Sequence, residues 1–206
     1  MSDAAEEAAQ EEAAQEDEAA EEAAPTASPV SPDRRRRLLT VLFSVATGVV
    51  ILDQVTKALA VTYLEPRILA GDGPVPLLGS FLQLTFTRNS GAAFSLLTGF
   101  TWIFTAIAVA VAVVIVRTSR RLASLGWALA LGGLLGGSLG NLIDRLTREP
   151  GFGTGYVVDF LQLPYWPVFN VADMSIVGSA ILMVVLTIRG IEYDGGGTAA
   201  PATPAE

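Results

Sequence analysis

The segment L-A-S-L-G-W-A-L-A-L-G-G-L-L-G-G-S-L-G-N-L-I, at residues 122–143, is apolar throughout and contains no charged residue. Crossing the roughly 30 Å hydrocarbon core of a membrane takes about 20 helical residues, so we predict a membrane-spanning helix here. Its glycines recur every fourth residue in two series, Gly132, Gly136, Gly140 and Gly133, Gly137. Because such small-xxx-small ridges let helix backbones approach closely, the helix is predicted to pack tightly against others.

Three further segments have the length and apolar character of membrane-spanning helices. They cover residues 38–64, 100–116 and 168–188. The whole chain is 51% hydrophobic with a mean hydropathy of +0.48, which is unusual for a soluble domain of 206 residues. We therefore predict an all-α membrane protein, a four-transmembrane-helix bundle.

Basic residues predict the orientation of the helices, because Lys and Arg are enriched in cytoplasmic loops. The loops 65–99 and 145–167 hold only four arginines between them. The other basic groups lie together on one side if both termini are cytoplasmic, which predicts an N-in, C-in protein with four crossings. These groups are residues 34–37 before the first segment, Arg117, Arg120 and Arg121 between the second and third, and Arg189 after the fourth.

The two ends of the chain differ in composition from its middle. Residues 1–33 carry eleven acidic residues and no Lys or Arg, so the net charge of −8 belongs to this tail, and the remainder, with ten acids against thirteen bases, is about +3. We predict a disordered acidic tail with a basic flank over 1–37, a membrane domain over 38–189 and a disordered tail over 190–206. A partner-binding role for the acidic tail is the alternative.

The loop 65–99 is predicted to contain a small extracytoplasmic β-element. Large apolar residues alternate with polar ones in F-L-Q-L-T-F-T-R, 81–88, which follows V-P-L-L-G at 75–79. Strict alternation of β-forming residues favours a strand over a helix. The run ends at N-S-G-A-A-F, 89–94, where turn-forming and small residues permit close backbone approach. We expect this element to lie on the outer mouth of the bundle.

The absence of Cys and His excludes disulfides, thiolate chemistry and Cys-based metal sites, and it removes the commonest catalytic base. Asp159, in V-V-D-F, and Asp173, in F-N-V-A-D, each lie beside an apolar membrane-length segment, where ionisable residues are costly and often functional. Two carboxylates that share one proton can hydrolyse a peptide bond without a metal or a covalent intermediate. Taken alone, Asp173 is also compatible with a helix cap and Asp159 with an exposed loop acid.

Position suggests which of the two aspartates carries the proton. Asp173 comes at the start of the fourth segment, where the N-terminal amides of a helix favour an anion. We hypothesise that Asp173 is the ionised partner and that Asp159 is protonated, although the pair titrates as a unit.

Further polar residues are predicted at the same end of the bundle. Asp53 and Lys57 form an i,i+4 acid–base pair in the first segment, and the long Lys57 side chain can extend outward. Asn141, Asp144 and Arg145 close the third segment. Arg145 offers five donors, which can hold substrate carbonyls or a site carboxylate, or anchor the helix end to phosphates.

Five blocks of the sequence, in order, resemble the signature blocks of the lipoprotein signal peptidases, or signal peptidase II. They are D-Q-V-T-K at 53–57, N-S-G-A-A-F at 89–94, G-N-L-I-D-R at 140–145, V-V-D-F at 157–160 and F-N-V-A-D at 169–173. The resemblance covers roughly residues 38–189. It implies a four-helix bundle with an extracytoplasmic β-cradle, and an aspartic endopeptidase of the bacterial cytoplasmic membrane. Such enzymes remove the signal peptide from diacylglyceryl-modified prolipoproteins by cleaving just before the lipidated Cys.

The resemblance also implies roles for individual residues. The catalytic pair falls on Asp159 and Asp173. The implied partners are prolipoprotein substrates and membrane lipid, with no nucleic acid, and the implied enzyme is a monomer that uses no metal and no cofactor. Substrate-binding or site-supporting positions fall on Asn89, Gly91, Asn141, Asp144, Arg145, Asn170, Asp53 and Lys57.

Two other classes compete with a peptidase. A small four-helix proton or ion transporter would use intramembrane acids and bases, but it predicts charges at the bilayer midplane and an internal repeat. The midplane segment 106–116 carries no charge, and the helices show no repeat. A membrane scaffold without enzymatic activity would not require Asp159 and Asp173 together.

Overall fold

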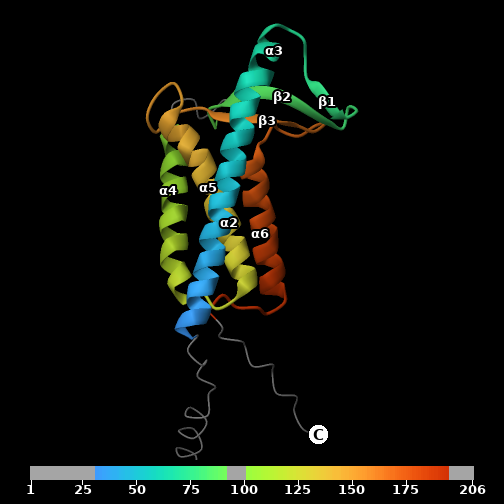
Figure 1. The fold of residues 1–206 in the computed structure, drawn as a ribbon. Coiled ribbons are helices and arrows are strands. Elements are labelled where there is room, and N and C mark those ends of the chain that lie inside the picture. The colour runs from blue at the N-terminus through green and yellow to red at the C-terminus, as the bar shows by residue number, and fades with distance from the viewer. Residues whose placement is uncertain (1–30, 92–100, 195–206) are drawn as a thin grey trace, which may run out of the picture.

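The computed structural model describes residues 31–91 and 101–194, and it places long helices side by side with a small sheet at one end (Figure 1). The predicted tails at 1–30 and 195–206, and residues 92–94 of the N-S-G-A-A-F block, lie outside the described residues. The long helices are α2 (Pro32–Leu59), α4 (Thr101–Thr118), α5 (Leu125–Thr147) and α6 (Val171–Ile188).

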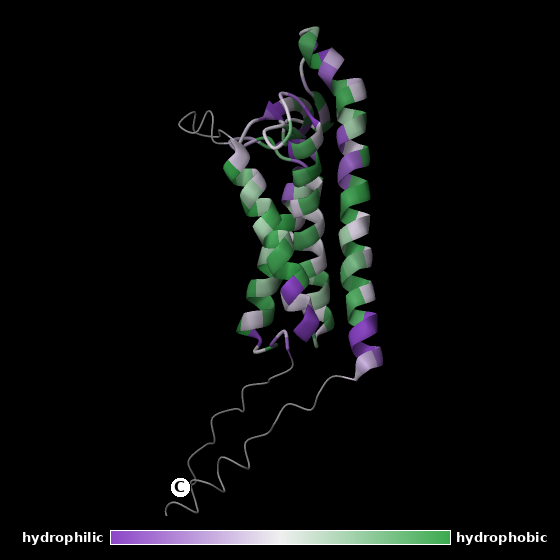
Figure 2. Ribbon diagram, turned by 90° about the vertical axis from the view of Figure 1, so that its left-hand side faces the viewer, coloured by the Kyte–Doolittle hydropathy of each residue, from purple (hydrophilic) through white to green (hydrophobic). Residues whose placement is uncertain are grey.

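Within the described residues, four helical stretches are long and apolar enough to cross a membrane, which confirms the predicted four-helix bundle. The first stretch runs from α2 through a π-helical turn, η1 (Ala60–Leu64), into α3 (Glu65–Leu69). Figure 2 shows apolar residues along most of the helix surfaces, with hydrophilic residues gathered toward the two ends of the bundle.

The helix ends differ from the predicted bounds for local reasons. α2 begins at Pro32 rather than at residue 38, because the Ser31 side chain accepts the Arg34 N–H and proline suits the first helical turn. α5 begins at Leu125 rather than at 122, because Leu122 leaves the short helix η2 (Ser119–Arg121) with an extended backbone. α6 begins at Val171 rather than at 168, because Asn170 caps it. Residue 100, the predicted start of the second span, lies outside the described residues.

The central helix is α5, and its two glycine series contact different neighbours. A Cβ added at Gly132 or Gly136 would come within 2.6 or 2.7 Å of a backbone carbonyl oxygen of α2. A Cβ at Gly137 would come within 2.5 Å of a carbonyl oxygen of α6, and one at Gly133 would overlap Ser179 of the same helix. The small residues therefore bring α2 and α6 against α5 on two sides, as the small-xxx-small pattern predicts.

A three-stranded antiparallel sheet in the described part of the chain covers the end of the bundle where α2 leaves it (Figure 1). Its strands β1 (Val75–Leu78) and β2 (Leu82–Asn89) confirm the predicted β-element. The third strand, β3 (Val157–Gln162), was not predicted, because V-V-D-F-L-Q is short and its first four residues are all buried, so it lacks the alternation of a half-exposed strand. β3 pairs with β2 so that Asp159 lies opposite Thr87.

Candidate active site

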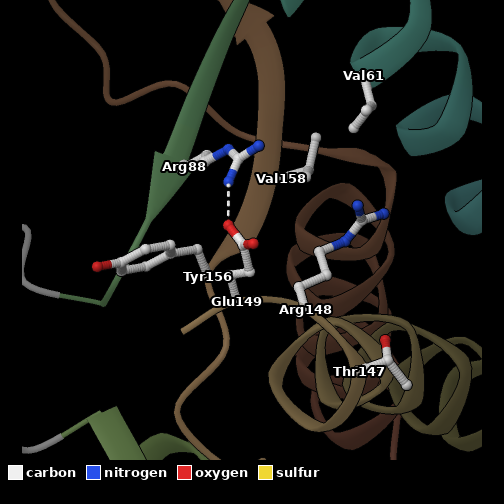
Figure 3. A pocket seen from close by; sticks show the side chains of 7 residues that line it. All are labelled: Val61, Arg88, Thr147, Arg148, Glu149, Tyr156 and Val158. Carbon is white, nitrogen blue, oxygen red and sulfur yellow. Dashed lines mark hydrogen bonds and ion pairs between the residues drawn. The ribbon is translucent and has the colours of Figure 1, made fainter. Parts of the chain in front are cut away.

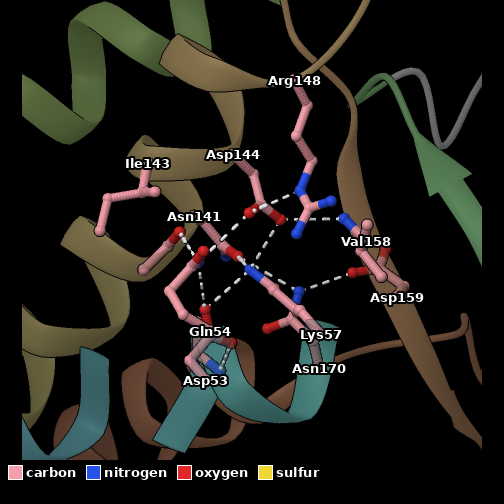
Figure 4. Close-up of polar contacts among 12 residues, drawn as sticks. Asp53, Gln54, Lys57, Asn141, Ile143, Asp144, Arg148, Val158, Asp159 and Asn170 are labelled. Atoms are coloured by element: carbon pink, nitrogen blue, oxygen red, sulfur yellow. Dashed lines mark hydrogen bonds and ion pairs between the residues drawn. The ribbon is translucent and has the colours of Figure 1, made fainter. Parts of the chain in front are cut away.

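Asp159 is held on β3 by two side-chain amides. Asn89, the last residue of β2, donates to Asp159 Oδ2 at 2.8 Å. Asn170 donates to Asp159 Oδ1 at 2.6 Å (Figure 4). The side chain is 1% exposed, so the alternative of an exposed loop acid is wrong. Burial raises the pKa of the Asp159 carboxyl from 3.8 to about 6. The amide bonds oppose this rise, and the nearby Asp173 charge adds to it.

Asp173 lies in the first turn of α6 and is half-buried. Its backbone N–H donates to Asn170 Oδ1 at 3.0 Å, and its own Oδ2 accepts the Asn170 backbone N–H at 3.2 Å, which together form a capping box. The helix-cap interpretation of Asp173 is therefore confirmed. Its other oxygen, Oδ1, accepts a hydrogen bond from Asn141 Nδ2 at 2.8 Å, so both carboxylate oxygens receive donors.

Asn170 joins the two aspartates. It is fully buried, and its backbone N–H binds Asp173 while its side-chain amide donates to Asp159 and to Asn141 Oδ1. Both aspartates line one cavity of about 410 Å³. The remaining wall is polar toward the aspartates, with Asn89, Asn141 and Arg145, and apolar along α4, with Phe104, Ile107 and Val111. The site thus offers two carboxylates and an apolar groove to one ligand.

A second pair of aspartates, Asp53 and Asp144, is buried behind this cavity and is bridged by Lys57. Lys57 Nζ lies 2.9 Å from Asp53 Oδ2 and 3.0 Å from Asp144 Oδ2, and all three side chains are 0% exposed (Figure 4). The prediction that Lys57 extends outward is wrong, because two carboxylates and Asn141 Oδ1, at 2.8 Å, hold the ammonium group inside. Arg148 adds a second cation, with Nε 2.9 Å from Asp144 Oδ1.

These ion pairs also position the backbone around the site. Asp53 Oδ1 accepts the Ala172 N–H at 2.9 Å, which ties α2 to the start of α6. Asp144 Oδ2 accepts the Val158 N–H at 3.0 Å, which fixes β3 next to Asp159. Gly140 allows this packing, since a Cβ there would lie 2.6 Å from Asp53 Oδ2. The Asp53–Lys57–Asp144 cluster therefore holds both elements that carry the aspartates of the cavity.

Arg145 binds carbonyl groups of its own chain. Its Nη1 donates to Gly155 O at 3.1 Å and to Ser90 O at 3.5 Å, and its guanidinium carbon lies 5.4 Å from the ring centre of Phe104. The side chain is 7% exposed, so it is not a surface anchor for phosphates. Arg145 therefore fastens the turn after β2 to the loop before β3, at the edge of the cavity.

Gly91 is required by this packing. Its φ of +85° is favourable for glycine, and its N–H donates to Asn89 Oδ1 at 2.7 Å. A Cβ at Gly91 would come within 2.7 Å of the Phe104 ring and 3.1 Å of Arg145 Nη2. The structure thus brings all ten predicted site residues to one end of the bundle, in or directly behind the cavity.

Comparison with known proteins decides the family. The family described as signal peptidase (SPase) II matches residues 45–189. The chain belongs to the signal peptidase II family. It is 53% identical over 170 residues to the lipoprotein signal peptidase of Mycobacterium avium (strain 104), covering 82% of this chain and 91% of that protein. It is 49% identical over 179 residues to that of Mycolicibacterium smegmatis (strain ATCC 700084 / mc(2)155), covering 87% of this chain and 73% of that protein.

A solved structure supports the same assignment. It is described as a bacterial membrane enzyme, and it superposes with a TM-score of 0.62 at 31% identity, covering 72% of this chain and 92% of that one. The chain is therefore a bacterial membrane protein and a peptidase. The transporter alternative has no support from these relatives.

Three further residues in and around this candidate site were not predicted. Gln54 Nε2 donates to Gly140 O at 3.0 Å and lies 3.2 Å from both Asp53 Oδ2 and Asp144 Oδ1, so it closes the ion cluster. Its place inside the D-Q-V-T-K block was the available signal. Arg148 follows Asp144 by one helical turn. This i,i+4 spacing predicts an acid–base pair, as it does for Asp53 and Lys57. Phe104 could not be singled out from the sequence, because it lies among other apolar residues of the second span.

Proposed function

We propose that this chain is an aspartic endopeptidase that removes signal peptides from diacylglyceryl-modified prolipoproteins, cutting just before the lipidated Cys, with Asp159 and Asp173 as its catalytic pair. One observation carries the proposal: two carboxylates on different elements reach one cavity and are joined by a single buried residue, Asn170. Membership of the signal peptidase II family supports the reaction class and the prolipoprotein substrate.

In the proposed mechanism the two aspartates hold one proton between them. Asp173, ionised and stabilised by Asn141 and by the α6 amides, takes a proton from water, and the water oxygen bonds to the scissile carbonyl carbon. Protonated Asp159 gives its proton to the carbonyl oxygen. The carbon–nitrogen bond then breaks, the amine receives the proton held by Asp173, and a hydroxyl of the tetrahedral intermediate returns a proton to Asp159.

The environment of Asp159 supports its assignment as the proton carrier. Its pKa of about 6 lets it keep a proton in part near neutral pH, and the side chains that donate to it within the described residues are amides rather than cations. The second aspartate pair has the opposite environment, since Lys57 and Arg148 lie against it. We therefore assign chemistry to Asp159 and Asp173 and a supporting role to Asp53 and Asp144.

The apolar wall of the cavity suits a lipid-modified substrate. Ile107, Val111 and Leu134 continue the cavity from the aspartates between α4 and α5. An acyl or signal-peptide segment can lie on this wall while the scissile bond reaches the carboxylates. We propose that the enzyme acts as a monomer, without cofactor, on substrates that arrive from the membrane.

The test uses purified full-length protein in detergent with a diacylglyceryl-modified prolipoprotein, and it scores the mobility shift on cleavage. Asp159→Asn and Asp173→Asn should each lower the rate by a factor of 10² to 10⁴ or more, roughly the range for loss of a general acid or base. Asp72→Asn, an exposed acid of the same outer region, is the matched control and should cleave normally. Cleavage that survives either aspartate change in folded protein contradicts the assignment, as does loss of activity with a chelator.

We further propose that both termini are cytoplasmic and that the aspartate end faces outward, as the basic residues predict. Because the chain has no Cys, a single introduced cysteine is the only thiol that a maleimide can label. Phe152→Cys, at an 85% exposed position near β3, should react with a membrane-impermeant maleimide in intact spheroplasts. Arg189→Cys, after α6, should react only after lysis, and the reverse pattern would overturn the orientation.

A further inference from the structure

Arginines from two separate elements line one pocket at the end of the bundle opposite the aspartates. Arg35 comes near the start of α2, and Arg120 and Arg121 come from η2, between α4 and α5. The pocket has a volume of about 310 Å³, and Leu122 and Asp194 complete its lining. All three arginine side chains are exposed, whereas Leu122 beside them is buried.

The walls of this pocket are fixed by contacts between segments. The Leu122 N–H donates to Ser119 O, which closes η2, and the Ala123 N–H donates to Tyr193 O at 2.7 Å. Trp127 Nε1 donates to Ile191 O at 2.6 Å, so the segment after α6 is bound twice to the start of α5. The backbone that carries Arg120 and Arg121 is therefore held against the segment 191–193, which leads to Asp194.

Charge distinguishes this end from the other. Eight arginines and three acids lie here in the described residues, against four arginines and four acids in the described parts of the outer segments, 65–91 and 145–167. The eight are residues 34–37, Arg117, Arg120, Arg121 and Arg189, with Asp33, Glu192 and Asp194 as the acids. The outer set is Arg67, Arg88, Arg145 and Arg148 with Glu65, Asp72, Glu149 and Asp159. Figure 3 shows the outer arginines Arg88 and Arg148, and Arg88 is already bound by Glu149.

We propose that the pocket formed by Arg35, Arg120 and Arg121 binds the phosphate of an anionic membrane lipid. Guanidinium groups bind phosphate oxygens through paired hydrogen bonds, and three arginines line this pocket together with one acid, Asp194. Basic residues at the membrane surface attract anionic lipid headgroups. Leu39 follows Arg35 by one turn and begins a hollow along α2 that also includes the exposed Phe43 and Ile51. This apolar surface accommodates acyl chains beneath the headgroup, which a soluble phosphate would not use.

The experiment compares lipid retention by two variants with the same loss of charge. Full-length protein is reconstituted in nanodiscs of phosphatidylcholine with a minority of phosphatidylglycerol, and native mass spectrometry counts the retained lipids. The pocket variant is Arg35→Gln/Arg120→Gln/Arg121→Gln. The matched control is Arg34→Gln/Arg36→Gln/Arg37→Gln, which removes three charges from the same helix end but none from the pocket. Prolipoprotein cleavage in detergent reports that both variants are folded.

Wild-type protein should retain phosphatidylglycerol over phosphatidylcholine, the pocket variant should retain about tenfold less, and the control should lose less than about twofold. Equal losses in the two variants would show diffuse surface attraction and overturn the pocket. Displacement by millimolar inorganic phosphate would show a soluble-anion site, and it would overturn the lipid assignment. Retention that appears only after Glu16, Glu18, Glu21 and Glu22 are changed to Gln would show that the acidic tail occupies the pocket, which also overturns it.

Discussion

The molecule contains two pairs of aspartates on either side of Asn141, and they differ in the partners that surround them. Asp53 and Asp144 are buried against the cations Lys57 and Arg148. Asp159 and Asp173 receive hydrogen bonds from neutral amides, and within residues 31–91 and 101–194 neither has a Lys or Arg at ion-pair distance. A neighbouring cation favours the charged form of a carboxylate more strongly than a neutral amide does, so a buried carboxylate held by amides alone keeps a proton more readily. The environment of Asp53 and Asp144 therefore suits a structural role, and that of Asp159 and Asp173 suits acid–base chemistry.

Asn141 links the two pairs and keeps them distinct. Its Oδ1 accepts from Lys57 and from Asn170, so its Nδ2 is directed to Asp173. Lys57 has three donors and no acceptor, so it can face only the oxygen of this amide. The ion cluster therefore orients an amide that stabilises a carboxylate of the cavity, without placing a cation next to it.

The largest effect is expected from removing the cation of the supporting pair. Lys57→Met leaves Asp53 and Asp144 buried with one fewer cation, which costs about 3–5 kcal/mol of unfolding free energy. Thermal unfolding in detergent measures the loss. Arg88→Met is the matched control, because Arg88 also bridges two acids, Glu65 and Glu149, but is 44% exposed. That change should cost less than about 1 kcal/mol, and equal losses would contradict the contrast between buried and exposed pairs.

The opposite sign is expected for Asp159, in the pair that lines the cavity. The folded protein binds a proton at Asp159 more strongly than the unfolded chain does, so stability falls as the pH rises from about 4 to about 6, and the cost is fully present above that range. The difference between 3.8 and about 6 corresponds to about 3 kcal/mol at most. Asp159→Asn, which has no charge to bury, should therefore raise the unfolding free energy at pH 8 by about 1–3 kcal/mol and have little effect near pH 4.

Asp144→Asn is the control for that measurement. It removes a charge from a site where Lys57 and Arg148 lie against it, so it should lower stability at pH 8. If both changes shift stability in the same direction, the two pairs do not differ in the way that their partners indicate.

Much of this contrast was predictable from the sequence, and the rest depended on contacts between distant segments. The four spans, the β-element and the positions of the ten site residues follow from hydropathy, alternation and the five sequence blocks. The inward position of Lys57 did not follow, because only the structure shows Asp144, 87 residues later in the chain at the end of α5, on its other side. The same holds for β3, whose pairing with β2 joins segments far apart in sequence.

A smaller effect, a loss of about tenfold in kcat, is expected when Asn141, which contacts both pairs, is replaced. Asn141→Leu removes the Nδ2 donor to Asp173, and a hydrogen bond to a charged group contributes about 1.5 kcal/mol or more. The measurement is kcat for cleavage at one fixed pH.

Gln54→Leu is the matched control for the linking residue. Gln54 is also an amide in this region, but its bonds go to Asp53, Asp144 and Gly140 O, on the supporting side. The change should lower stability and leave kcat close to the wild-type value. A tenfold loss of kcat with Gln54→Leu, or no loss with Asn141→Leu, would mean that Asn141 does not connect the two pairs.

The smallest effect concerns the pH dependence of kcat/KM, which reports ionisations of the free enzyme. If protonated Asp159 is required, kcat/KM should fall as the pH rises through about 6, which is the alkaline limb of the profile. Asn89 donates to Asp159 Oδ2 and thereby favours the charged form, so it lowers the pKa of this carboxyl. Asn89→Leu should move the limb to higher pH by about half to one pH unit. Asn89→Asp keeps the oxygen that accepts the Gly91 N–H but replaces the donor with a second acid, so its shift should be larger. A limb that stays in place, or moves to lower pH, in both variants would show that a group other than Asp159 controls it.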